Sequence, residues 1–235
     1  MIRLTHRSDD KELLDADNVP FADIRLNMQE LNTINTLLGG HRVTLMGLRH
    51  LIKTRDDQTL SICEIGCGGG DNLLVIYNWC TNHGIKTKLT GIDIKIECIN
   101  FCRQQYNIEV DWICSDYKDV LFEHKPDILF SSLFCHHFTQ PELAFMVQWM
   151  KVNSNNGFFI NDLHRHILAY YSIRILTKMF SKSYLVKNDA PLSVKRGFKR
   201  TDWENIFRES GISTYSLQWK WAFRYLIVCQ NSSTT

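Results

Sequence analysis

The spacing of the hydrophobic positions changes near residue 60. Before it, apolar side chains recur every three or four residues, which predicts one face of a helix. They are Phe21, Ile24, Met28, Leu31, Ile34 and Leu38. Gly39 and Gly40 follow and are typical of the left-handed turn that ends a helix. A second apolar set between Val43 and Ile52 predicts another helix.

From Leu60 onward, short apolar runs alternate with longer amphipathic ones. The expected strands are LSICEIG, KLTGIDI, VDWICSD, PDILFSS and GFFINDL. The expected helices are DNLLVIYNWCTNHG, KIECINFCRQQY and PELAFMVQWMKV. Strands and helices that alternate at this spacing predict βαβ units, and hence an α/β fold with a parallel sheet covered on both faces.

The C-terminal part has a different pattern. Thr201 to Glu204 reads as a capping box for a helix that ends near Glu209. STYSLQWKW and FRYLIVCQ then lie close together, which predicts an antiparallel hairpin added to the sheet. The preceding insertion holds a very apolar helix, Ile167–Phe180, and a polar loop in which SVKRGFKR is expected to be solvated. Such an insertion would lie above the carboxyl ends of the strands.

We expect one domain, because the chain has four prolines and no Pro/Gly/Ser-rich linker. Its expected parts within residues 1–235 are an N-terminal helical cap (1–56), a ligand-binding core (57–162), a substrate lid (163–200) and a C-terminal helix with hairpin (201–235).

Composition removes several classes of function. A net charge of +2 without a dense basic block argues against nucleic-acid binding. No segment approaches the roughly 18–20 apolar residues of a membrane span, and MIRLTHRSDDKELLD lacks the apolar core of a signal peptide, so we expect a cytoplasmic protein. The eight cysteines form no CxxC pair. Buried reduced thiols are therefore expected, with no metal site.

The most informative stretch is ICEIGCGGGDN, from Ile62 to Asn72. A phosphate-binding P-loop needs a lysine after its last glycine, and Asp71 stands there instead. In the dinucleotide fingerprint the third glycine would also fall on Asp71, whose negative charge would oppose a pyrophosphate at the helix N-terminus. The remaining pattern is an acid followed by alternating glycines: Glu64, Gly66, Gly68 and Gly70.

Three further motifs follow in order: Asp93 at the end of LTGIDI, Asp116-Tyr117 after the next strand, and DILFSSLFCHHF. The ordered set resembles the class I S-adenosylmethionine-dependent methyltransferases. The resemblance implies S-adenosylmethionine (SAM) as cofactor, S-adenosylhomocysteine (SAH) as product and a Rossmann-like seven-stranded sheet, mostly parallel with an antiparallel C-terminal hairpin. It implies these cofactor-binding residues: Glu64, Gly66, Cys67, Gly68, Gly70, Asp93, Ile94, Asp116, Tyr117 and Ser132.

The resemblance also suggests individual roles. Glu64 would lie near the amino group of SAM, and Asp116 near the adenine amino group, with Tyr117 lining the ring. One carboxylate can accept hydrogen bonds from both ribose hydroxyls, which is the role expected of Asp93. Helix capping is the alternative role for Asp93 and Asp116. Cys67 is expected to fill space rather than to act as a nucleophile.

A phenol or enol acceptor gains reactivity when a histidine removes its proton. The candidates are His136 and His137 after the fourth strand, and His166, with His164, after the fifth. A structural role is the alternative for His137, and Arg165 is a candidate for holding an oxygen of the acceptor.

The flanking stretches LNTINTLLGGHR, DLHRHILAYY and DAPLSVKRGF resemble bacterial methyltransferases of secondary metabolism. This implies a small aromatic or polyketide-like acceptor, O-methylation, and an approach of Asn35 to SAM. Tyr170, Tyr171 and Phe180 would line the acceptor chamber. The alternative is that the helix carrying these three side chains packs in the core or forms a homodimer contact. The open alternatives are C-methylation of a quinone-like ring, a nicotinamide-dependent oxidoreductase, and a non-catalytic SAM-binding protein.

Overall fold

The structure is a computed structural model that describes residues 4–16, 18–53 and 59–231. Its elements, in chain order, are the 3-10 helix η1 (Leu13–Asp15), α1 (Phe21–Leu37), α2 (Gly40–Leu51), β1 (Leu60–Ile65), α3 (Asp71–Asn82), β2 (Thr87–Asp93), α4 (Ile96–Gln105), β3 (Val110–Cys114), the 3-10 helix η2 (Tyr117–Asp119), β4 (Ile128–Ser132), the 3-10 helix η3 (Cys135–His137), α5 (Gln140–Val152), β5 (Gly157–Leu163), α6 (Ile167–Phe180), α7 (Tyr184–Arg196), α8 (Arg200–Glu209), β6 (Ser216–Lys220) and β7 (Arg224–Gln230).

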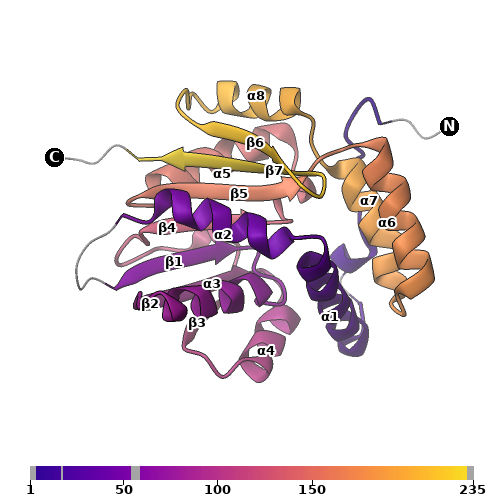
Figure 1. The fold of residues 1–235 in the computed structure, drawn as a ribbon, viewed down its shortest axis with the longest axis horizontal. Helices are drawn as coiled ribbons and strands as arrows, with labels where there is room; N and C mark the ends of the chain where they lie inside the picture. The colour runs from indigo at the N-terminus through magenta and orange to yellow at the C-terminus, as the bar shows by residue number, and fades with distance from the viewer. Residues whose placement is uncertain (1–3, 17, 54–58, 232–235) are drawn as a thin grey trace.

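One seven-stranded sheet organises the molecule, in the order β3-β2-β1-β4-β5-β7-β6. Strands β1 to β5 are parallel, whereas β7 runs antiparallel to both β5 and β6. Figure 1 shows β7 pointing in the opposite direction to β1 and β5. The expected mixed sheet with a C-terminal antiparallel hairpin is confirmed.

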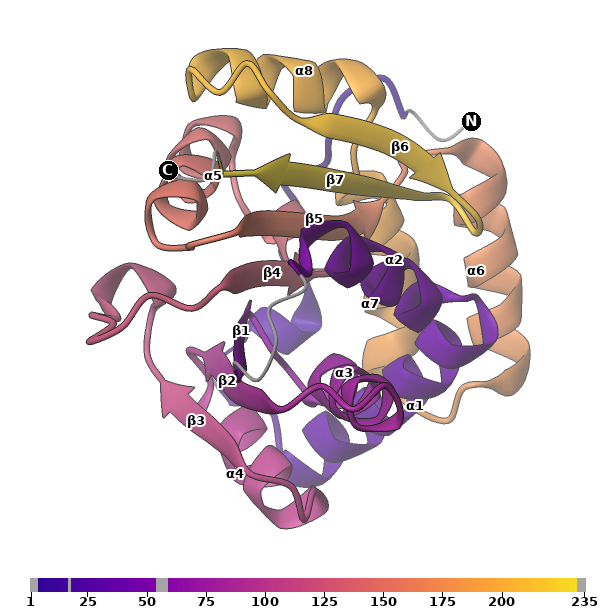
Figure 2. The same ribbon diagram turned by 60° about the vertical axis from the view of Figure 1, so that its left-hand side comes forward.

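The strands bury both of their faces, because successive side chains point to opposite sides of the sheet. Ile62 packs on one face with Leu73 of α3 and Leu48 of α2. Its neighbour Cys63 packs on the other face with Met146 of α5 and Phe207 of α8. Helices therefore cover both faces of the sheet, as Figure 2 shows.

Helices α1, α6 and α7 lie beyond the carboxyl ends of the parallel strands (Figure 1). Helices α6 and α7 pack against each other, and α1 packs against α7. The insertion of residues 163–200 thus lies above the strand ends, where parallel α/β sheets bind their ligands.

Two local predictions are wrong. The expected polar loop after Phe180 contains helix α7, whose start is capped by Ser183: its Oγ accepts a hydrogen bond from the backbone N–H of Val186 at 3.3 Å. The basic stretch SVKRGFKR is consequently not a solvated loop, since Arg196 is buried. Helix α8 also begins before the expected capping box, because Asp202 accepts the backbone N–H of Lys199 at 2.6 Å.

All eight cysteines are unpaired, and seven of them are buried. Cys114 is exposed, because it ends β3 at the edge of the sheet. No helix in the described ranges is long and apolar enough to cross a membrane.

Candidate active site

A cavity of about 650 Å³ opens at the carboxyl ends of the strands. The loops after β1, β2, β3 and β4 line it from below, and η1, α1, α6, α7 and the start of β7 line it from above. Nine of the ten expected cofactor residues border it: Glu64, Gly66, Cys67, Gly68, Asp93, Ile94, Asp116, Tyr117 and Ser132.

The glycine-rich loop is shaped by its contact with the loop after β4. Gly66 has φ +67°, and a Cβ there would lie 2.2 Å from Cδ2 of Phe134, so only glycine fits. Gly70 does not line the cavity. It begins α3 with φ +71°, and a Cβ there would lie 2.7 Å from Trp112. The geometry of Gly70 serves packing and the turn, and not contact with a ligand.

Glu64 brings a buried carboxyl group to the cavity. Its Oε1 accepts a hydrogen bond from Nδ2 of Asn72 at 3.0 Å, while its buried Oε2 has no partner. Burial, together with Asp71, raises the pKa of Glu64 well above its usual range. A cationic group beside Oε2 would satisfy this oxygen and stabilise the carboxylate, as the ammonium of an amino acid does.

Asp93 ends β2 and connects two loops. Its Oδ2 accepts the N–H of Gly68 at 2.9 Å, and its Oδ1 accepts that of Lys95 at 2.9 Å. Burial raises the pKa of Asp93, and these two hydrogen bonds oppose that effect. Each carboxylate oxygen keeps a free lone pair, so hydroxyl donors in the cavity can still bind. The capping alternative holds in part: Asp116 caps η2 by accepting the N–H of Lys118 at 3.1 Å, while it also lines the cavity.

His136 is held between two carboxylates. Its Nδ1 lies 2.8 Å from Oδ1 of Asp162, and its Nε2 lies 3.5 Å from Oε1 of Glu12. Burial alone would lower the pKa of His136, but the two carboxylates outweigh it and raise the pKa to about 9. At neutral pH the buried ring is therefore an imidazolium.

His137 is the more accessible member of the pair. Its Nε2 lies 3.8 Å from Oε2 of Glu12, and its Nδ1 lies 3.4 Å from Oδ1 of Asp15. Ligand atoms of Glu12, His136 and His137 all lie within 4.8 Å of one another, a grouping that a metal ion could also use. The absence of a metal site stays a prediction.

Glu12 and Asp15 come from residues 4–16, here called the N-terminal strap, whereas Asp162 lies on β5. Arg7 fixes the strap by donating to the backbone carbonyls of His136 and Phe138 at 3.1 and 2.8 Å. Asp189 of α7 accepts the backbone N–H groups of Leu13 and Leu14 at 2.8 and 3.0 Å. The strap thereby lies beside His136 and His137, at the end of the cavity that is here called the acceptor end.

The other histidine candidates lie outside the cavity lining. His166 caps α6, with its Nδ1 accepting the N–H of Leu168 at 3.2 Å, and its ring stacks on Phe223. The interpretation of Arg165 as an acceptor-binding residue is wrong, because its buried guanidinium pairs with Asp202 at 3.0 Å and does not border the cavity.

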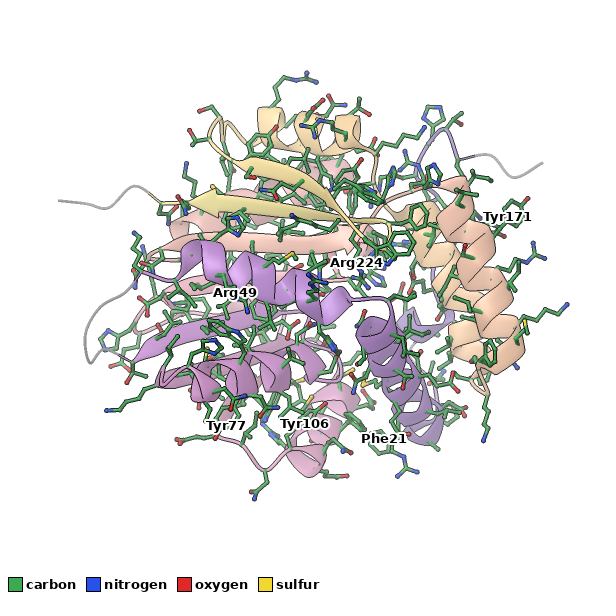
Figure 3. All side chains as sticks on the ribbon, viewed as in Figure 1. Phe21, Arg49, Tyr77, Tyr106, Tyr171 and Arg224 are labelled. Carbon is green, nitrogen blue, oxygen red and sulfur yellow. The ribbon has the colours of Figure 1, made fainter. Side chains whose placement is uncertain are left out.

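The lid presents other side chains than expected. Tyr170, Tyr171 and Phe180 do not line the cavity, and Figure 3 shows Tyr171 on the outer side of α6. The residues that do line it are small or aliphatic: Ala169, Ser172, Ile173 and Leu176 of α6, and Ala190, Ser193 and Val194 of α7.

Sequence reasoning missed the charged residues Glu12, Asp15, Asp162 and Arg224. Each depends on a contact distant in sequence. The one signal available for Arg224 is a lone cation at the start of the apolar run FRYLIVCQ.

Residues 62–157 match a family described as a methyltransferase domain. No curated protein sequence matches this chain. Among solved structures, it is similar to the plantazolicin methyltransferase BpumL in complex with SAH, with 21% identity, a TM-score of 0.61, and coverage of 88% of this chain and 76% of the other.

Two more distant methyltransferases have the same fold. Human N-acetylserotonin methyltransferase with SAM is 16% identical, with a TM-score of 0.61 and coverage of 88% of this chain and 55% of the other. Magnesium protoporphyrin IX methyltransferase from Synechocystis with SAH is 14% identical, with a TM-score of 0.51 and coverage of 92% and 90%.

At these identities the solved structures establish the fold, and the match of residues 62–157 indicates a methyltransferase. The solved neighbours hold SAM or SAH. The cavity of this protein fits SAM in two respects: the unpartnered oxygen of Glu64 suits an ammonium group, and Asp93 suits neighbouring hydroxyls. The match of residues 62–157 favours a methyltransferase over a nicotinamide-dependent oxidoreductase.

Proposed function

We propose that this protein is a class I SAM-dependent methyltransferase that methylates an oxygen atom of a small acceptor, aromatic or polyketide-like in type. The supporting observation is that one cavity is bordered both by Glu64 and Asp93 and by the cluster of Glu12, His136 and His137. SAM supplies an electrophilic methyl group on its sulfonium. The contribution of the protein is to align the acceptor and to manage its proton.

On the cofactor side, Glu64 Oε2 would accept from the amino group of SAM, and Asp93 would accept from the ribose hydroxyls. Asp116 and Tyr117 would border the adenine. The backbone of the glycine-rich loop would hold the cofactor, together with the side chains of Cys67, Ile94 and Ser132.

On the acceptor side, His137 takes the proton of the acceptor's hydroxyl. Glu12 and Asp15 flank its ring at 3.8 and 3.4 Å and stabilise the imidazolium that forms. His136 stays charged between Asp162 and Glu12, and stabilises the negative charge that develops on the acceptor oxygen. His166 caps α6 instead and is not assigned to this step.

The acceptor chamber has apolar walls. Ile173, Leu176, Ala190 and Val194 present short or aliphatic side chains, which leave room for a flat ring. The N-terminal strap closes the same end, so that bulk water is kept from the acceptor oxygen.

The test is turnover on a panel of phenols and enolisable polyketide analogues with SAM, with SAH release and product mass measured together. Fragmentation of the product separates an O-methyl from a C-methyl group. An O-methylated product supports the proposal, and a C-methylated ring replaces it with the quinone-type alternative. Binding of SAH without turnover on any acceptor would contradict it in favour of a non-catalytic SAM-binding protein.

A further inference from the structure

A buried cation lines the cavity on the same side as Glu64. Arg224 begins β7 and is only 3% exposed, yet it borders the cavity. It is the one arginine among the described residues of the lining. Figure 3 shows it near the start of α2, at the end of the sheet that faces α1 and α6.

The partners of Arg224 are neutral. Its Nη2 donates to Oδ1 of Asn35 at 2.8 Å, and its Nη1 donates to Oδ1 of Asn161 at 3.4 Å. In the described part of the chain no carboxylate forms an ion pair with it, whereas Arg165 pairs directly with Asp202.

Asp162 and Asp71 attract the guanidinium without a direct ion pair, and burial still lowers the pKa of Arg224 to about 10. A buried charge without a direct counter-ion is costly. An anion that enters the cavity would therefore be favoured at this guanidinium.

A continuous set of hydrogen bonds joins Arg224 to Glu64. Asn161 Nδ2 donates to Thr44 Oγ1 at 3.1 Å, and Thr44 Oγ1 donates to Asn72 Oδ1 at 3.1 Å. Asn72 in turn donates to Glu64 at 3.0 Å. The unpartnered carboxylate oxygen and the unpaired guanidinium thus belong to one buried polar network that borders one cavity.

We propose that Arg224 and Asn35 form a carboxylate-binding subsite. Together with Glu64, the subsite holds the two charges of an α-amino acid group, the methionine portion of SAM. Guanidinium and carboxylate match as a two-point pair. The inference rests on the proposed function. A carboxylate on the acceptor has the same chemistry, so the experiment separates the two sources.

The first arm measures the binding of SAH and of 5′-methylthioadenosine by calorimetry. The second ligand has the same nucleoside but no amino acid group. Arg224→Met should weaken SAH binding by about 10- to 100-fold, the loss expected for a charged hydrogen-bonded pair. Binding of 5′-methylthioadenosine should not change, which also reports a correctly folded cofactor site. The matched control is Arg49→Met, because Arg49 of α2 lies over Trp79 at 5.0 Å and outside the cavity lining.

Arg224→Lys covers the case in which the methionine variant does not fold. Lysine keeps the positive charge but cannot donate two parallel hydrogen bonds to a carboxylate, as a guanidinium does. SAH binding should therefore weaken, while 5′-methylthioadenosine binding stays constant. The second arm compares the KM of a hydroxybenzoic acid with that of its methyl ester. A rise for the acid alone in the Arg224 variants, with SAH binding unchanged, assigns the carboxylate to the acceptor.

If neither SAH binding nor the KM of the acid changes, the subsite is overturned while the proposed function stands. If the unaltered protein binds neither SAH nor 5′-methylthioadenosine, the proposed function fails as well. The two failures are therefore distinguishable.

Discussion

The two ends of the cavity are built in different ways. Apart from Asn35 and Arg224 of the proposed carboxylate subsite, the cofactor end is formed by strand ends and their loops within residues 60–132, with Gly68 bonded to Asp93 across only 25 positions. The acceptor end joins residues far apart in sequence: Arg7 reaches His136 across 129 positions, and Leu13 reaches Asp189 across 176.

The electrostatics of the two ends differ as well. At the cofactor end, Glu64 has a buried oxygen without a hydrogen-bond partner and forms no ion pair with a cationic side chain among the described residues; Asp162 also has one unpartnered oxygen, but its other oxygen pairs with His136. At the acceptor end His136 and His137 face carboxylates on both nitrogens. Ligand binding should therefore depend on the first set, and pH-dependent stability and turnover on the second.

The largest expected effect is on kcat, and it distinguishes the acceptor end of the cavity from the cofactor end. His137→Gln should lower kcat by about 100-fold or more, since the acceptor loses its proton acceptor. SAH affinity should stay constant, because His137 belongs to the acceptor end. His50→Gln is the control: the His50 side chain is exposed on α2, lies outside the cavity lining and hydrogen-bonds the carbonyl of Met46. Equal losses of kcat and SAH affinity would contradict the division.

The next effect concerns the cofactor end alone. Asp93→Ala should weaken SAH binding by about 10- to 100-fold, because charged hydrogen bonds to the ribose are lost. Asp111→Ala on β3 is the matched control, since its carboxylate is exposed and pairs only weakly with Lys88 at 3.8 Å. Calorimetry with SAH is the measurement, and an unchanged affinity would refute the role of Asp93.

A smaller effect appears as a pH dependence of stability. Because the folded pKa of His136 is raised to about 9, above its usual 6.5, its stabilising contribution is complete below pH 6.5. The contribution is lost as the pH rises from 6.5 to about 9. Urea unfolding should show the free energy of unfolding falling by on the order of 2 kcal/mol over this range. His136→Gln should be less stable throughout and lack this slope; an unaltered slope would exclude His136 as its source.

The smallest expected effect is that of metal removal. Glu12, His136 and His137 converge, but each nitrogen of His136 already faces a carboxylate. Dialysis against EDTA should leave turnover unchanged. Loss of turnover that one divalent cation restores would show instead that the cluster is a metal site.

The cofactor end could be predicted from sequence because its determinants are local. A strand, a glycine turn and an acid at the next strand end follow from patterns a few residues long. Only Gly70 departs from its expected place, because it packs on Trp112, which lies on another strand.

The acceptor end could not be predicted in the same way. Helix α7 contains Pro191 and many polar residues, which favour a loop when neighbours are ignored. One of those polar residues, Asp189, holds the N-terminal strap in place by accepting the backbone N–H groups of Leu13 and Leu14. Glu12 and Asp15 likewise become candidate site residues only through their contacts with His136 and His137. No local pattern contains such pairs.

The attachment of the strap has a consequence for the order of folding. Contacts across more than 100 residues close large loops, and such contacts form late compared with local ones. The protein should therefore acquire its glycine-rich turn between β1 and α3 before the N-terminal strap reaches α7. Pulsed hydrogen exchange during refolding would detect this as protection of residues 60–93 ahead of Leu13 and Leu14; simultaneous protection would show that both ends assemble in one step.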